Sequence, residues 1–337
     1  MAEIRGRVWR GGALQSEAVE AVSLPDLLAQ PDVLVWLDLC GPSPAELEAL
    51  AGRLGLDPHA VEDASDHRER PKATRHPGHT FVTAYATRLE AEGSRGYASR
   101  LELTRVSAFV LPNALVTVRA EAADGFDIDE VLARWDDNAD LLTVAGQHGV
   151  GVLLHGLLDV VVDGHFETMQ SLDDAVERLE DLLFDDAVQT RLVQGHVYRL
   201  RKELVELRRV VLPMREVVNA VLRHRADADS THELDGWYDD LYDHVLRASE
   251  WTESLRDMIA TLFETNLSLQ DAHLNAVMKK LAGWAAIIAV PTAVTGWFGQ
   301  NVPYPGFGDL LGVWQSLVLI LVCSVVLYVL FRRRDWI

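Results

Sequence analysis

The sequence predicts an α+β domain, then long amphipathic helices, and then a hairpin of two membrane-spanning helices. Three observations support this prediction: mixed strand and helix signals near the N-terminus, a long apolar stripe at helical spacing, and two uncharged apolar runs near the C-terminus. The predicted parts are an α/β domain (1–150), a long-helix bundle and stalk (151–280), two spans (281–298 and 310–331) with a loop between them (299–309), and a basic tail (332–337).

Composition limits the possible partners. The 337 residues carry 51 acidic and 31 basic side chains, a formal net charge of −20. Binding to nucleic acid needs clustered Lys and Arg, so this balance argues against a nucleic-acid partner, and it is compatible with attracting cations. No apolar run follows Met1–Arg5, so we expect no signal peptide.

The N-terminal domain begins with a predicted strand at 33–38. Ser43, followed by Pro44 and by Glu46 three residues on, has the pattern of a capped helix start. Further strands are predicted at 80–88, 101–110 and 114–120, with a hairpin turn at Asn113.

This domain shows no chemistry typical of an enzyme. It has no phosphate-binding glycine loop, nucleophile elbow or visible nucleophile–base set, so we predict that the protein is not an enzyme. His67, His76 and His79 match no zinc motif and are interpreted as loop histidines.

Three long helices are predicted next. Apolar residues at steps of three and four place helices at about 160–183 and 192–223, the second interrupted by Pro213, and a helix from Leu234 into the first span. We expect them to pack as an antiparallel bundle. Asp227–Asp271 holds twelve carboxylates and two arginines, which fits either a solvated helix face or a site for divalent cations that prefer oxygen ligands.

Two uncharged runs, Leu281–Phe298 and Leu310–Phe331, are long enough to cross a bilayer as helices. Pro291 is expected to kink the first. Lys279 and Lys280 precede the first run, Arg332–Arg334 follow the second, and the loop between them has no Lys or Arg. The positive-inside rule then places both termini in the cytoplasm. The competing interpretation is a core hairpin of a soluble protein.

The C-terminal pattern resembles the CorA family of two-span divalent metal transporters, which includes the ZntB zinc transporters. The family's Gly-Met-Asn triplet after the first span is similar to Gly299-Gln300-Asn301, with Gln in the middle place. Residues 275–281, 212–216 and 70–72 and the Arg-Arg-Arg-Asp-Trp tail also resemble family segments.

The resemblance implies a funnel-shaped homopentamer in the cytoplasmic membrane, with the first span lining a pore. Asn301 would form a ring at the outer mouth beside Gly299 and Gln300, Thr292 a deeper polar ring, and Asn275 would lie near the cytoplasmic end. Met278, Leu281 and Ala289 would form an apolar gate. For Thr295 two roles are open: its side chain would either line the pore or cap the helix backbone.

The resemblance also implies closure by cytosolic divalent ions. Asp240 aligns with the family's regulatory acidic residue, with Asp243 and Glu264 as further candidates. Mg²⁺ would be both substrate and regulator, with no separate cofactor, and Co²⁺ and Ni²⁺ further substrates. Relatives often carry a Met-Pro-Glu-Leu run after the triplet, whereas this loop supplies only Asp309. A proton-coupled Zn²⁺ transporter of the ZntB kind and a non-transporting anchor or sensor are the alternatives.

Overall fold

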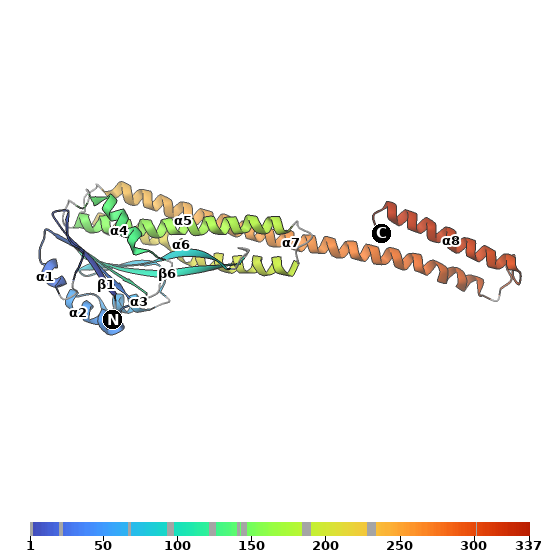
Figure 1. Cartoon of the computed structure of the whole chain (residues 1–337), viewed down its shortest axis with the longest axis horizontal. Helices are drawn as coiled ribbons and strands as arrows, with labels where there is room; N and C mark the ends of the chain where they lie inside the picture. The colour runs from blue at the N-terminus through green and yellow to red at the C-terminus, as the bar shows by residue number, and fades with distance from the viewer. Residues whose placement is uncertain are drawn as a thin grey trace. The chain divides into compact units, whose positions relative to one another are not determined.

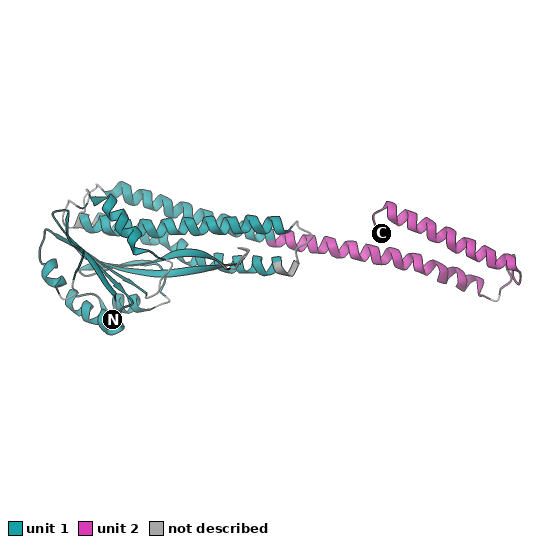
Figure 2. Cartoon of the chain, in the orientation of Figure 1, with its two compact units in different colours: residues 1–262 teal, residues 263–337 magenta. Residues whose placement is uncertain are grey.

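The computed structural model describes all residues except 1–2, 20–22, 67–68, 93–97, 121–125, 140–141, 143–146, 184–189, 228–233 and 301. The chain divides into two compact units, Met1–Leu262 and Phe263–Ile337 (Figure 2). Each unit is described separately.

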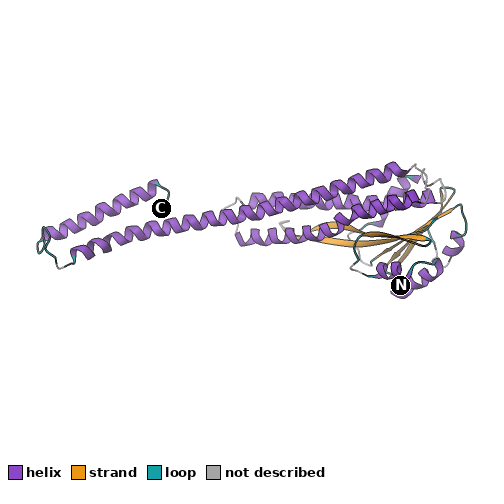
Figure 3. Cartoon of the chain, turned by 180° about the vertical axis from the view of Figure 1, so that it is seen from behind, coloured by secondary structure: helices purple, strands orange, loops and turns teal. Residues whose placement is uncertain are grey.

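The first unit contains a seven-stranded sheet with the strand order β2-β1-β3-β7-β6-β5-β4. Its strands are drawn in orange in Figure 3. Its strands are β1 Glu3–Arg10, β2 Ala13–Ser16, β3 Val33–Cys40, β4 Lys72–His76, β5 His79–Glu92, β6 Ala98–Val110 and β7 Ala114–Arg119. Only β3 and β7 pair in parallel. The strands predicted from 33, 80, 101 and 114 are confirmed, whereas β1, β2 and β4 were not predicted.

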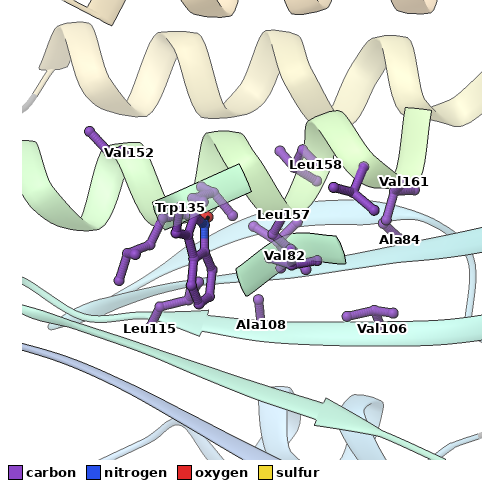
Figure 4. Packing of buried hydrophobic residues seen from close by; sticks show 14 of the residues in the cluster. Val82, Ala84, Val106, Ala108, Leu115, Trp135, Val152, Leu157, Leu158 and Val161 are labelled. Carbon is purple, nitrogen blue, oxygen red and sulfur yellow. Dashed lines mark hydrogen bonds between the residues drawn. The ribbon is translucent and has the colours of Figure 1, made fainter. Parts of the chain in front are cut away.

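Helices cover both faces of the sheet. α1 (Leu24–Leu28), α2 (Pro44–Leu54) and α3 (Pro58–Ser65) pack on one face, and α4 (Ile128–Asp137) and α5 (Gln147–Leu183) on the other. Alternation along β3 explains this, because Val35 and Leu37 point to the first core while Leu34 and Trp36 point to the second. Figure 4 shows the second core, where Trp135 lies among strand and α5 side chains.

Local sequence signals fix the start of α2 and the turn between β6 and β7. Ser43 and Glu46 form the predicted capping box at the start of α2. Asn113 holds the β6–β7 turn, because its side-chain amide donates to the carbonyls of Leu28, Gln30 and Val33 at 3.2–3.3 Å.

α5, α6 (Thr190–Asp227) and the first part of α7 (Asp235–Phe298) lie side by side in the first unit and share a buried core (Figure 1). Two sequence predictions for these helices were wrong. α5 begins at Gln147 rather than near Val160, and α6 runs without a break through Pro213. Met214 and Val217 are fully buried in the core, and this packing offsets the hydrogen bond that a proline removes from a helix.

Two glycines in the first part of α5, before Val160, lie close against other elements. A Cβ at Gly156 would come within 2.7 Å of the Trp135 indole nitrogen, and one at Gly151 would collide with the Arg225 guanidinium. Glycine lowers helix propensity, so the sequence pattern hides the first turns that tertiary packing stabilises.

The second unit is a helical hairpin formed by the last part of α7 and by α8 (Leu310–Arg333) (Figure 1). Among the described residues, α5, α7 and α8 are each long and apolar enough to cross a membrane. Of the apolar window, 78% is buried in α5 but only 6% in α7 and in α8. α5 is therefore a core helix of the first unit, whereas α7 and α8 present unburied apolar surface.

Candidate ion pathway and metal-binding residues

One face of α7 carries the residues predicted to line a pore. At about 100° per residue, Asn275, Met278, Leu281, Ala289 and Thr292 fall within an arc of about 120°. We call this arc the pathway face. Gln300 lies two residues beyond the end of the helix.

A different face of α7 packs on the end of the chain. Gly283 is buried, and a Cβ there would lie 3.1 Å from Ile337 Cγ1 and 3.7 Å from Phe331 Cδ2. Gly283 points about 140° away from the middle of the pathway face. The hairpin contact therefore leaves the pathway face uncovered in the single chain, where Met278 is 62% and Leu281 64% exposed.

Pro291 lies inside α7 and the helix continues past it. Proline has no N–H, so the carbonyl of Ile287 loses its usual helical donor. The Thr295 hydroxyl donates to the Pro291 carbonyl at 2.8 Å. Thr295 thus bonds to its own backbone, while Thr292 is exposed on the pathway face.

The signature triplet follows the last turn of α7. The Gly299 amide donates to the Thr295 carbonyl at 2.9 Å, and a Cβ at Gly299 would approach that oxygen to 3.0 Å, so the turn leaves little room for a side chain. Gln300 is exposed. Asn301, the predicted outer ring, lies outside the described residues.

Two glycines bring the loop close to α8. Gly306 has φ +93°, and a Cβ at Gly312 would come within 2.6 Å of the Gly306 carbonyl oxygen. Tyr304 packs edge-on against Phe298 and Phe307. Asp309 is exposed at the start of α8, without a side-chain capping bond.

The candidate regulatory acids are separate in the single chain. Asp240 is 68% exposed on α7, with its Oδ2 3.8 Å from His244 Nε2. Asp243 is exposed one turn further along, and Glu264 is exposed in the second unit. Within the described part of the chain, no three His, Cys, Asp or Glu side chains are arranged to hold a metal ion.

The structure adds ionisable neighbours that the sequence analysis missed. His155 and Asp159 lie on α5, where burial lowers the pKa of His155 and raises that of Asp159. The charge of Asp240 acts on His155, and Arg134 pairs with both Asp159 and Asp163, the latter at 2.7 Å. The spacing of 155, 159 and 163, four residues apart on one helix face, is the signal that could have identified them.

Comparisons with known proteins fit this geometry. The family model of the CorA-like Mg²⁺ transporter protein matches residues 31–333. The chain belongs to this family. CorA-family members are membrane transporters, so the chain is a divalent metal-ion transporter rather than an enzyme, and the sequence prediction of this family is confirmed.

CorA-type relatives align over nearly the full chain. YfjQ of Bacillus subtilis is 28% identical over 86% of this chain and 88% of its own length. The zinc transport protein ZntB of Yersinia pestis is 27% identical over 98% and 99%. The complete structure of the CorA magnesium transporter from Methanocaldococcus jannaschii superposes with a TM-score of 0.74 at 22% identity, covering 99% of this chain and 98% of that one. The predicted α+β domain, long helix and apolar C-terminal helices are therefore confirmed.

Proposed function

We propose that five copies of the chain form a pore that conducts Mg²⁺, with Co²⁺ and Ni²⁺ as further substrates, across the cytoplasmic membrane. The first unit and both termini would lie in the cytoplasm. The basic residues Lys279, Lys280 and Arg332–Arg334 and the uncharged loop support this orientation.

The pathway face is the observation that carries this proposal. It combines polar and apolar positions, and all five of its residues are exposed in the single chain. Polar groups in a membrane span usually line a pathway or a helix interface. Around a five-fold axis, Thr292 and Asn301 would form rings of oxygen ligands that bind hydrated Mg²⁺ through its waters.

Met278, Leu281 and Ala289 would close the same pathway by excluding water. Leu281 is the sharpest test, because its side chain is 64% exposed in the single chain and supports no internal packing there. Leu281→Ser is expected to leave flux measurable at Mg²⁺ concentrations that silence the natural protein. An unchanged closing curve would contradict the gate assignment.

A Zn²⁺ transporter of the ZntB kind is the second candidate. The similarity to ZntB over nearly the full chain favours it, as does the loop Val302–Gly306, which lacks an acidic residue. Zn²⁺ prefers Cys and His ligands, and the pathway face as described offers neither. This difference in ligand chemistry places Mg²⁺ first.

Ion flux into proteoliposomes separates the two. The flux of Mg²⁺ and of Zn²⁺ would be measured with and without a pH gradient. The purified natural protein would be compared with the variants Asn301→Ala and Thr292→Val. Mg²⁺ entry that ignores the gradient and falls in both variants is the expected result. Zn²⁺ entry that depends on the gradient would establish the second candidate, and absence of flux for both ions would remove the transport proposal for these ions.

A further inference from the structure

A cavity of about 270 Å³ lies in the first unit, and none of its lining residues is discussed above as an ion ligand. It is bounded by the turn between β4 and β5, the β6–β7 turn, and the ends of α5, α6 and α7 that lie nearest to them. Ligand pockets usually range from about 300 to 1,000 Å³, and this cavity lies just below that range, so it suits only a small molecule.

The cavity is lined by basic side chains in a strongly acidic chain. Five of its lining side chains are arginine or histidine: Arg75, His76, His79, His224 and Arg225. No carboxylate is among the described residues that line it. Two carboxylates that do not line the cavity pair with residues that do. Asp57 lies 3.4 Å from His76 Nδ1, and Asp235 lies 3.9 Å from Arg225 Nη2. The lining is therefore suited to an anion.

His79 provides a second, independent sign of a ligand. Its side chain is only 5% exposed, and its Nε2 has no hydrogen-bond partner among the described residues. The ring stacks on His76 with centroids 5.1 Å apart, and burial lowers the pKa of His79. A buried ring nitrogen without a hydrogen-bond partner costs free energy. With its proton on Nε2, the ring would donate to an oxygen atom of an anion in the cavity.

Arg225 is held in place at the opposite wall. Its guanidinium carbon lies 4.9 Å from the centre of the Tyr238 ring, and the Tyr238 hydroxyl donates to the Gly151 carbonyl at 2.8 Å. A side chain at Gly151 would collide with Arg225 Nη1, so glycine creates the space that the guanidinium fills. A fixed arginine fork is well suited to bind phosphate oxygens.

The remaining wall is apolar and includes Val110, Leu111 and Val221. It could contact the organic part of a ligand. We propose that this cavity is a binding site for a small phosphate-bearing anion of the nucleoside monophosphate class, with the phosphate between Arg75, His79 and Arg225. The proposal is independent of the ion that the protein transports.

Calorimetric titration of the full-length protein in lipid nanodiscs tests it. The buffer should be stripped of divalent ions on a resin, because a soluble chelator is itself a multivalent anion. The probes are AMP, inorganic phosphate, and adenosine, which lacks the phosphate. Binding of AMP without binding of adenosine is expected. If phosphate alone binds as tightly as AMP, the anion group is the recognised part and the site stands.

Two exposed arginines give a matched pair of variants. Arg75→Gln removes a charge from the cavity, and Arg53→Gln removes the same charge from α2, which does not line it. Loss of a charged hydrogen bond should weaken AMP binding about tenfold or more in Arg75→Gln and leave Arg53→Gln unchanged. No heat with either AMP or phosphate, or equal affinity in the two variants, would overturn the proposal.

Discussion

Asp240 differs from most carboxylates of α7 because it interacts with two histidines. Its side chain is mostly exposed, yet it acts electrostatically on His155 across the helix packing, and His244 of the next turn lies 3.8 Å away. The alignment of Asp240 with a family residue came from sequence, but the cluster around it did not. Residues 155–163 belong to another helix, and only the packing of α5 on α7 brings them near.

Replacing Asp240 by Asn should raise the cytosolic Mg²⁺ concentration that closes the pore. The change removes one negative charge from an exposed position, so folding stability should shift by no more than about 0.5 kcal/mol. Flux into proteoliposomes at increasing Mg²⁺ on the cytoplasmic side measures the effect. The matched control is Asp239→Asn, also exposed on α7 and about 100° around the helix. Equal closing curves for the two variants would reject a special role for Asp240.

His165 makes the stability of the first unit depend on pH. Full burial lowers its pKa from the usual 6.5 to about 4, and its Nε2–H donates to the Tyr85 carbonyl at 2.8 Å. Above pH 6.5 the ring is neutral in both states and contributes no pH dependence. As pH falls from 6.5 to 4, the unfolded chain takes up a proton that the folded chain excludes, and stability falls by about 3 kcal/mol.

His165→Gln removes this titration, so its melting temperature should decline less steeply than that of the natural protein between pH 6.5 and 4. Scanning calorimetry over this range is the measurement. His59→Gln is the control, because the His59 side chain is 86% exposed. If the melting temperatures of all three proteins decline in parallel, the buried neutral imidazole is not the cause.

At the scale of elements, sequence patterns predicted helices well where local signals decide them. The capping box at Ser43 and the apolar stripe of α7 depend on neighbours in the chain. The sequence patterns failed where contacts between elements decide whether a segment is helical. Gly156 in α5 and Pro213 in α6 both weaken a helix on their own, yet both lie inside one.

Gly156→Ala and Gly195→Ala should change stability in opposite directions. Both glycines lie inside helices, where alanine is intrinsically favoured by about 1 kcal/mol. A Cβ at Gly195 meets nothing within 4 Å, so that variant should be more stable. A Cβ at Gly156 would overlap the Trp135 indole, whose N–H donates to the Leu153 carbonyl, and overpacking of this kind costs about 1–3 kcal/mol.

The measurement is the melting temperature of each variant in the same detergent. A rise for Gly195→Ala with a fall for Gly156→Ala is expected. A rise for both would mean that Trp135 moves aside at little cost. Close packing would then not explain why α5 begins at Gln147 rather than near Val160.

At the scale of the whole molecule, hydropathy alone does not separate a buried core helix from a candidate membrane span. Within the described ranges it selects three helices, and their burial separates α5, a core helix, from α7 and α8. The sequence did predict the two-helix hairpin, because its basic flanks and Gly- and Pro-rich loop are local features. It could not predict which face of α7 contacts the chain's own C-terminus, since that contact joins residues more than 40 positions apart.

The uncovered pathway face leads to a prediction about assembly. If five copies surround an axis, Thr292→Cys in a background without Cys40 and Cys323 should cross-link neighbouring chains through a short bifunctional reagent. Leu319→Cys, on α8, should cross-link much less, because lipid would surround that helix.

Each chain then carries one thiol, and each thiol reacts once, so the largest product on a denaturing gel should be a linked pair of twice the 37.5 kDa chain mass. The mass of the protein part of the intact assembly, measured by light scattering in detergent, should be five times the chain mass, and a value of twice the chain mass would indicate a dimer with Thr292 at its interface. Equal yields of the linked pair from Thr292→Cys and Leu319→Cys would mean that the two helix faces are equally accessible, and Thr292 could then not line a pore.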